Sequence, residues 1–338
     1  MKPLITFGEI MLRLSTPGFG RFVQTTSLNV NYGGGEANVA AAAAFLGLPA
    51  RHVTRFPANE WGVAAAAAYR RYGVDTRHVV FAEGERMGTY FLEFGAMMRA
   101  TKVIYDRTGS AFATMRPDEF DWENILADAG WFHFTGITPG ISESAARACL
   151  TAVQTANRLG VTVSADVNSR KNLWKWGKSA DEVMPELTAG CDLIVCGGGD
   201  AEELYGIHAD KRDPDGKFAS MCKQIQARFP RVKKILTTKR GSISANHNTL
   251  MGRCWTNGQL LETPTYDMVP MVDRIGGGDA FLGGFLYGLD RYNDDQRALD
   301  FATAASALKH SIEGDFNLVS PAEVEAVMGG ETSGKLSR

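Results

Sequence analysis

The strongest local signal in the sequence is the stretch Asp273-Arg274-Ile275-Gly276-Gly277-Gly278-Asp279-Ala280-Phe281, in which three glycines lead directly into a predicted helix. Backbone N–H groups at a helix N-terminus bind anions, because they lack intrahelical partners and the helix dipole favours negative charge. A phosphate group is the natural occupant. A carboxylate beside a phosphate would be repelled unless it takes a proton from an attacking hydroxyl, so Asp279 indicates a phosphotransferase. A tight turn in which Asp279 only adds charge to the helix start would have the same residues.

Around this stretch the chain alternates short apolar segments with helical patterns, which predicts an α/β fold. The expected strands are residues 4–7, 161–166, 192–196 and 234–238, and the expected helices are 36–46, 61–72, 142–159, 279–292, 295–310 and a last helix capped by Ser320. Two further β-rich runs, 88–94 and 102–106, predict a hairpin-type flap. No internal repeat or linker interrupts the sequence, so we expect one domain over residues 1–328 and a disordered tail at 329–338.

Composition and charge narrow the possible classes of protein. The 338 residues include 36 Lys+Arg and 38 Asp+Glu, a net charge of −2 without a basic patch, so nucleic acid is not an expected partner. The five cysteines are scattered and form no C-x-x-C motif, which indicates neither a disulfide framework nor a zinc site. The sequence has no apolar run of about 18 residues and no signal-peptide pattern before Gly8-Glu9, so we expect a soluble cytoplasmic protein without a membrane partner.

A second glycine cluster reads Asn31-Tyr32-Gly33-Gly34-Gly35-Glu36-Ala37-Asn38 and again leads into a predicted helix. Bare backbone lets a ligand approach closely, and the Asn38 side chain can both donate and accept hydrogen bonds, which suits a hydroxyl-rich ligand. An ordinary strand-to-helix turn would also fit these residues. Neither glycine cluster matches the P-loop or the dinucleotide-binding signature, which counts against both of those kinds of nucleotide site.

Polar side chains follow the predicted strand 161–166, where Asn168 and Arg170 come to one edge of the sheet. Arg170 can pair bidentately with a carboxylate or a phosphate, although a surface salt bridge would also explain it. On the flap, Tyr105 and Arg107 add a hydroxyl and a second guanidinium. This combination suits an acidic substrate.

Taken together, these motifs resemble the ribokinase-like (PfkB-type) carbohydrate kinases, whose pattern is a Gly-Gly helix start early in the chain and a D-T-x-G-A-G-D stretch late. The resemblance covers nearly the whole chain, from Gly8-Glu9 to about Val327. It is strongest to the 2-keto-3-deoxygluconate kinases, and the segments that carry this similarity are 8–15, 105–107 and 166–174.

The resemblance implies a mostly parallel central sheet with helices on both faces, a β lid formed by residues 10–32 and 86–112, and ATP with Mg²⁺ as cofactors. The implied reaction is phosphorylation of the terminal hydroxyl of 2-keto-3-deoxy-D-gluconate, which yields 2-keto-3-deoxy-6-phosphogluconate. A kinase for 2-keto-3-deoxygalactonate or for a ketohexose is the alternative within this fold, and Arg107 with Arg170 favours an acidic substrate. A sugar-acid sensor without catalysis is an alternative from another class.

Position by position, the resemblance implies that Asp279 is the general base and that the amides of Gly276–Gly278 form an anion hole. Arg170 would lie between the substrate and the ATP phosphates and stabilise charge during transfer. The other implied substrate contacts are Gly34, Gly35, Asn38, Tyr90, Tyr105 and Arg107. The other implied nucleotide contacts are Asn168, Thr238, Lys239 and Gly241, together with Gly276 and Gly278 of the anion hole.

Two segments depart from the family pattern. Thr237-Thr238-Lys239-Arg240-Gly241-Ser242 falls where the family places a nucleotide loop, but it lacks the common T-x-G-x-x-G form. Cys196-Gly197-Gly198-Gly199-Asp200 replaces an N-x-x-E motif that is tied to magnesium, so Asp200 is the expected metal residue. The missing amide puts the catalytic rate in question. Glu202 and Glu203 fit charges at a helix start.

The lid also leads to a prediction about assembly. Its apolar side chains need cover on the face away from the sugar, and a second lid could provide it. We therefore expect a homodimer formed through the lids. The side chains in question are Phe91, Phe94, Val103 and Ile104.

Overall fold

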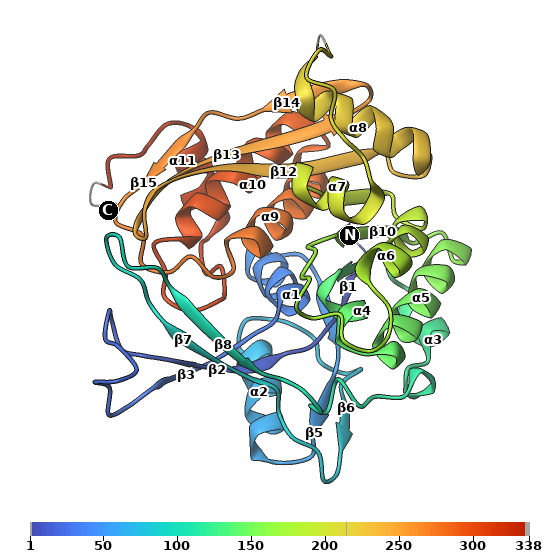
Figure 1. The fold of residues 1–338 in the computed structure, drawn as a ribbon, viewed down its shortest axis with the longest axis vertical. Coiled ribbons are helices and arrows are strands. Elements are labelled where there is room, and N and C mark those ends of the chain that lie inside the picture. Colours follow the sequence, from blue (N-terminus) through green and yellow to red (C-terminus); the bar gives the residue numbers. More distant parts are fainter. Residues whose placement is uncertain (1, 214, 335–338) are drawn as a thin grey trace.

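The computed structural model describes residues 2–213 and 215–334, which form an α/β fold around a nine-stranded sheet (Figure 1). The strands of this sheet are β1 (Leu4–Phe7), β4 (Ala50–Val53), β9 (Trp131–Thr135), β10 (Thr162–Asp166), β11 (Leu193–Val195), β12 (Lys234–Ser244), β13 (His247–Thr256), β14 (Gln259–Glu262) and β15 (Tyr266–Met268). Their order is β14-β13-β12-β11-β10-β9-β1-β4, and β15 also pairs with β13. The pairs from β4 to β12 are parallel and the others antiparallel, which confirms the predicted mostly parallel sheet.

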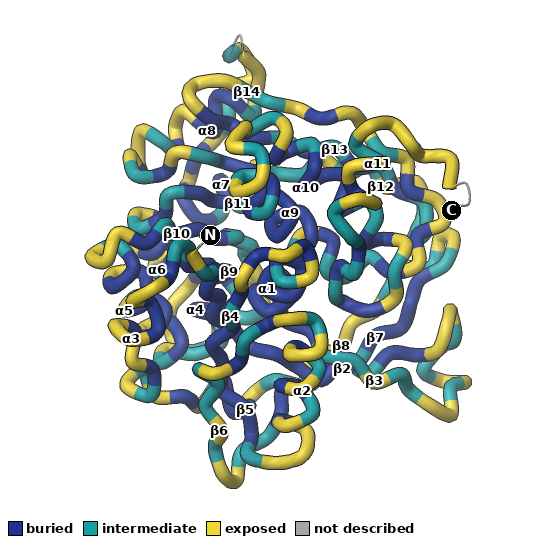
Figure 2. Tube along the Cα trace, turned by 180° about the vertical axis from the view of Figure 1, so that it is seen from behind, coloured by how far each residue is buried: buried dark blue, intermediate teal, exposed yellow. Residues whose placement is uncertain are grey.

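Helices cover both faces of this sheet, as predicted. One face carries α1 (Gly35–Leu46), α2 (Glu60–Arg70), α9 (Gly277–Tyr292) and α10 (Asp295–Lys309), with α11 (Pro321–Met328) packed against α10. The other face carries α3 (Trp122–Leu126), α4 (Ile137–Ile141), α5 (Glu143–Arg158), α6 (Ala180–Ala189), α7 (Gly198–Tyr205) and α8 (Gly216–Arg228), with the 3₁₀ turn η1 (Pro117–Glu119) before α3. The strand β1 is buried on both sides, so Leu4 joins the first core whereas Ile5 and Phe7 join the second. Figure 2 shows these buried segments in the interior and the exposed residues mainly in outer loops.

A smaller sheet projects from one side of the main body (Figure 1). Its strands are β2 (Met11–Ser15), β3 (Asn29–Gly33), β7 (Thr89–Glu93) and β8 (Lys102–Asp106), in the order β3-β2-β7-β8. The antiparallel pairing of β7 with β8 confirms the predicted hairpin. A separate parallel pair consists of β5 (Arg55–Pro57) and β6 (Val80–Ala82).

The register of the smaller sheet places its apolar side chains on two faces, because directly paired residues share a face. One row across the four strands, here called the outer row, consists of Leu14, Val30, Phe91 and Ile104. Val30 and Ile104 are 50% and 55% exposed. Two residues that were expected to share an exposed face with this outer row do not do so. Val103 lies on the opposite face with Tyr105, because side chains alternate along β8, and Phe94 is buried.

Local sequence signals predicted helix starts correctly, but the length of one strand was predicted wrongly. The Asn59 side chain caps α2 by accepting from the N–H groups of Trp61 and Gly62, and Ser320 caps α11 in a capping box. The strand expected at 234–238 with a loop after it is instead one continuous strand to Ser244, because β13 pairs with it along its whole length. The segment expected to be a nucleotide loop is therefore part of β12.

Three further expectations concern the described part of the chain. The five cysteines are all buried and free of disulfides. Among the described residues, no helix is long and apolar enough to cross a membrane. Residues 329–334 form no helix or strand, and positions 335–338 of the expected tail lie outside the described residues. The domain boundary at residue 328 stays a prediction.

Candidate active site

The N-terminus of α9 forms a loop of three glycines, residues 276–278, here called the anion loop. Gly276 is the N-cap with a φ of +81°, and a Cβ there would overlap the carbonyl oxygen of Asp315. A Cβ on Gly277 would come 2.6 Å from Cε1 of His310. A Cβ on Gly278 would have no described atom within 4 Å beyond its own neighbours, and this residue is exposed. The N–H groups of this first turn lack intrahelical acceptors and border open space, which suits an anion.

Asp279 follows in the first turn of α9, where its carboxylate is only partly exposed. Its Oδ2 accepts a hydrogen bond of 2.7 Å from Nδ2 of Asn38 on α1. Burial raises the pKa of Asp279 to about 8, although the hydrogen bond from Asn38 acts to lower it. The negative charges of Asp166, Asp315 and Glu36 also act to raise the pKa. A carboxylate with this proton affinity can accept a proton from an alcohol that is losing it to bond formation.

The glycine cluster before α1 lies beside Asp279. The N–H of Gly34 donates to Oδ1 of Asn38 at 3.3 Å, so the amide of Asn38 turns its NH₂ group towards Asp279. A Cβ on Gly35 would stand 3.9 Å from Oδ1 of Asp279. The predicted residues Gly34, Gly35, Asn38 and Asp279 therefore meet where α1 and α9 begin.

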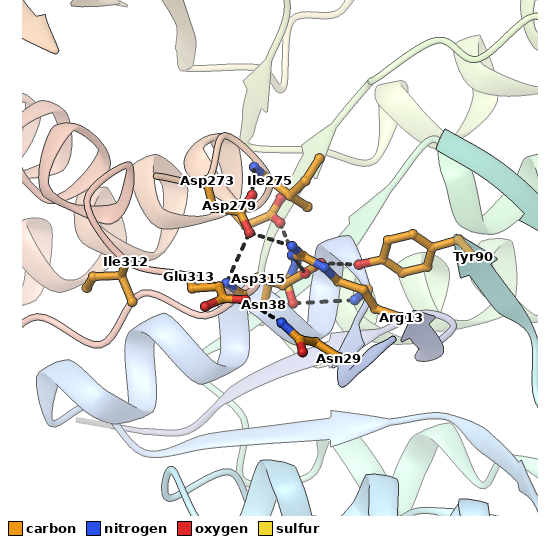
Figure 3. A network of polar contacts seen from close by, with 12 residues as sticks. Arg13, Asn29, Asn38, Tyr90, Asp273, Ile275, Asp279, Ile312, Glu313 and Asp315 are labelled. Atoms are coloured by element: carbon orange, nitrogen blue, oxygen red, sulfur yellow. Dashed lines mark hydrogen bonds and ion pairs between the residues drawn. The ribbon is translucent and has the colours of Figure 1, made fainter. Parts of the chain in front are cut away.

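A buried ion-pair network, shown in Figure 3, fastens the anion loop to the smaller sheet. Arg13 of β2 is fully buried, and its Nη2 and Nη1 each lie 2.5 Å from a carboxylate oxygen, of Asp273 and Asp315 respectively. Burial alone would lower the pKa of Arg13, but Asp315 and Asp273 outweigh it and raise the pKa above its ordinary value. Asp273 also accepts from the N–H of Ile275 at 2.9 Å, so the network holds the entry to the loop.

Sequence reasoning missed this network. Arg13 stands 302 residues before Asp315 in the chain, and only the folded topology brings them together. The signal that could have found it is an arginine at the centre of an apolar strand, Met11-Leu12-Arg13-Leu14-Ser15, since a buried cation requires a carboxylate partner.

The three lid residues that were predicted to contact the substrate lie in different environments. Tyr90 lies beside Arg13, and its hydroxyl donates to Oδ2 of Asp315 at 2.6 Å. Tyr105 is 60% exposed, and its ring centroid is 6.0 Å from that of Tyr90. Arg107 donates from Nε to Oε2 of Glu9 at 2.8 Å and also from Nη2 to the same oxygen. The positive charge of Arg107 is thus balanced within the protein.

The loop after β10 carries the other predicted polar residues. Arg170 is exposed and forms no ion pair with any described carboxylate. Burial and the nearby charge of Asp200 raise the pKa of Asp166 to about 7, and Arg170 opposes this shift. Asp200 accepts at 3.2 Å from the N–H groups of Ser169 and Gly197, so it caps α7 and holds this loop. Asn168, which directly precedes Ser169 in this loop, has a backbone φ of +32°.

On β12, the alternation of side chains separates the residues expected at the nucleotide. Thr238 shares a face with Arg240, whereas Lys239 and Gly241 occupy the other face. Arg240 was not among the predicted site residues, yet its Nη2 lies 3.2 Å from Nε2 of His310, beside the anion loop. Treating this segment as a loop removed the alternation that would have indicated Arg240.

The chain is similar to known proteins over most of its length. A family model described as pfkB family carbohydrate kinase matches residues 1–320. The chain therefore belongs to the pfkB family of carbohydrate kinases and is a sugar kinase, which confirms the resemblance and the enzyme class expected from its motifs. The sensor alternative is thereby disfavoured.

Several relatives span nearly the same length. The crystal structure of a 2-dehydro-3-deoxygluconokinase from Thermotoga maritima is 41% identical, covers 98% of this chain and 100% of its own, and superposes with a TM-score of 0.92. A 2-dehydro-3-deoxygalactonokinase from Haloferax volcanii is 33% identical over 331 residues, 98% of each chain. A 2-dehydro-3-deoxygluconokinase from Thermoproteus tenax is 31% identical over 334 residues, 97% of this chain and 94% of its own.

Proposed function

We propose that this kinase transfers the terminal phosphoryl group of ATP to the terminal hydroxyl of a 2-keto-3-deoxy sugar acid, with 2-keto-3-deoxy-D-gluconate as its substrate. The observation that carries the proposal is Asp279, a carboxylate of raised proton affinity held by Asn38 beside the open N–H groups of the anion loop. The relatives named for 2-dehydro-3-deoxy sugar acids support the substrate class.

The chemistry follows from the positions of these groups. Asp279 accepts the proton of the terminal hydroxyl while the hydroxyl oxygen bonds to the phosphorus atom and the bond to the ADP oxygen breaks. The N–H groups of the anion loop stabilise the negative charge of the transferring phosphoryl group. Asn38 keeps the carboxylate directed at the hydroxyl. Arg170, exposed and free of a described carboxylate partner, complements the charge of the phosphates or of the sugar acid.

Magnesium fits the carboxylates at the edge of β10 and α7. Burial and next the negative charge of Asp200 raise the pKa of Asp166 to about 7, so the two carboxyl groups repel each other. Carboxylate oxygens are the ligands that Mg²⁺ prefers, and a divalent cation relieves such repulsion. When bound, Mg²⁺ would supply neutralising charge for the ATP phosphates. We propose Asp200, together with Asp166, as the residues that hold it.

A second candidate substrate is 2-keto-3-deoxygalactonate, because the relative from Haloferax volcanii bears that activity in its name and covers 98% of each chain. The two acids differ only in the configuration of one hydroxyl. A ketohexose is less suited, since the exposed Arg170 provides positive charge that a neutral sugar does not need.

The experiment that tests the proposal is a comparison of ATP turnover on 2-keto-3-deoxygluconate, 2-keto-3-deoxygalactonate, gluconate, fructose and ribose. We expect turnover to be confined to the two keto-deoxy acids, with the higher kcat/KM on the gluconate form. A higher kcat/KM on the galactonate form would reverse the substrate order. Preferred turnover of fructose or ribose would contradict the acidic substrate class.

We also propose a homodimer in which the outer rows of two smaller sheets cover each other. An exposed apolar row on a sheet of only four strands is otherwise open to water, and β8 is an edge strand exposed along its whole length. The cytoplasmic location expected from the sequence stays a prediction.

A further inference from the structure

Arg240 is held in place by a neutral histidine. Its Nη2 lies 3.2 Å from Nε2 of His310, and Nδ1 of His310 lies 2.6 Å from the carbonyl oxygen of Ser306. A carbonyl oxygen can only accept, so Nδ1 carries the imidazole proton and Nε2 accepts the hydrogen bond from Arg240. Burial and then the charge of Arg240 lower the pKa of His310 to about 4, which keeps the ring neutral at physiological pH.

This pair lies directly against the anion loop. A Cβ on Gly277 would stand 2.9 Å from Nε2 of His310 and 3.5 Å from Nη2 of Arg240. The hydroxyl of Ser306 donates to the carbonyl oxygen of Gly277 at 2.7 Å, which joins α10 to the first turn of α9. The glycine at position 277 therefore lets the imidazole and the guanidinium reach the helix N-terminus.

The positive charge at this place lacks a counter-ion. Within residues 2–213 and 215–334, no carboxylate pairs with Arg240, and the neighbouring charge that acts on it is that of a second cation, Arg274. Burial and Arg274 lower the pKa of Arg240 to about 10, so the guanidinium stays charged at neutral pH. Of its five N–H donors, one binds His310. A half-buried cation beside another cation is unfavourable unless an anion joins them.

We propose that Arg240 binds the terminal phosphates of ATP at the anion loop and that His310 is the positioning residue that directs its guanidinium there. The inference rests on the proposed function, because it requires ATP as the phosphoryl donor. Arg240 adds charge-assisted hydrogen bonds to the backbone N–H groups of residues 276–278, and its planar donor set suits phosphate oxygens.

The first test compares Arg240→Gln and Arg240→Lys with Arg253→Gln. Arg253 on the neighbouring strand β13 pairs with Glu262 at 2.7 Å, so its variant removes the same charge away from the anion loop. Binding of the magnesium complex of a non-hydrolysable ATP analogue is measured by calorimetry, and KM is measured separately for ATP and for the sugar acid. We expect Arg240→Gln to weaken nucleotide binding about tenfold or more. Arg240→Lys should recover part of the affinity, and Arg253→Gln should match wild type.

The KM for the sugar acid should stay unchanged in Arg240→Gln, which a general loss of structure would not produce. Nucleotide affinity equal to wild type in this variant would overturn the inference alone. A wild-type protein that binds no magnesium–nucleotide complex would overturn the proposed function with it.

The second test concerns His310. His310→Gln replaces the ring nitrogen acceptor by an amide oxygen that can still accept from Arg240, whereas His310→Met fills similar volume without such an acceptor. We expect His310→Gln to bind the ATP analogue more tightly than His310→Met, with equal KM for the sugar acid. Equal nucleotide affinity in the two variants would remove His310 from the proposal. If either variant fails to fold, the Arg240 series decides.

Discussion

At the scale of single residues, Asp279 is a carboxyl group whose surroundings raise its affinity for a proton. Burial and three neighbouring carboxylates raise its pKa to about 8 from an ordinary 3.8. The folded protein therefore holds this proton more strongly than the unfolded chain does. The stabilisation that this proton provides is present at low pH and is lost as the pH rises through about 8.

The raised pKa of Asp279 leads to a prediction for how stability depends on pH. The free energy of unfolding of wild type should fall relative to that of Asp279→Asn as the pH rises from about 4 to about 8, because asparagine stays neutral. Urea unfolding at several pH values measures the difference. Asp290→Asn removes an exposed carboxylate from the same helix and should show no such trend. If the difference in the free energy of unfolding between wild type and Asp279→Asn does not change with pH, the raised pKa of Asp279 is contradicted.

The glycines of the anion loop allow a second test at this scale. Gly278→Ala places a methyl group where no described atom lies within 4 Å, so stability should change by less than about 0.5 kcal/mol. Because the methyl group occupies the proposed phosphate position, kcat/KM for ATP should fall roughly tenfold to 100-fold. Gly277→Ala, which would crowd His310, should instead destabilise the fold. Thermal unfolding and steady-state kinetics separate the two, and full activity of Gly278→Ala would contradict the phosphate position.

At the scale of elements, helix starts could be predicted because their signals are local. Asn59 and Ser320 act on N–H groups within three residues of themselves. The length of β12 could not be predicted from its own residues, since it depends on pairing with β13. Arg13 was missed because its carboxylate partners are remote in the sequence. Arg240 was missed because its segment was predicted to be a loop, whereas it belongs to β12.

The link between β2 and the anion loop leads to a prediction at this scale. Arg13→Met should lower the free energy of unfolding by about 3–5 kcal/mol, because it leaves Asp273 and Asp315 buried without a cation. The matched control is Arg158→Met, whose partner Glu123 is exposed, and we expect it to cost about 0–1 kcal/mol. Denaturant unfolding measures both. Equal losses would mean that the buried network contributes no more than a surface pair.

At the scale of the whole molecule, the site is assembled from segments distant in sequence. The smaller sheet supplies Arg13 and Tyr90, α1 supplies Asn38, and α9 supplies Asp279 (Figure 3). The fold class and the residues at the starts of α1 and α9 were predictable, because glycine-rich helix starts and family motifs mark them. The ion-pair links between these parts were not, because they depend on the tertiary arrangement.

The proposed dimer is tested at the same scale. Val30→Lys with Ile104→Lys places two charges in the outer row, so the double variant should be monomeric while wild type has the mass of two chains. Light scattering at micromolar concentration measures the mass. Val63→Lys, at an equally exposed apolar position on α2, should leave the dimer intact. A monomeric wild type would contradict the proposal.

The most direct measurement is the turnover number of Asp279→Asn on the preferred keto-deoxy acid, beside wild type and Asp290→Asn. Asparagine retains the shape of the side chain but cannot accept the proton of the hydroxyl. The proposed mechanism predicts that kcat falls roughly 10²- to 10⁴-fold in Asp279→Asn, with nucleotide binding retained and Asp290→Asn unchanged. A kcat within a few-fold of wild type would contradict the role of Asp279 as the general base.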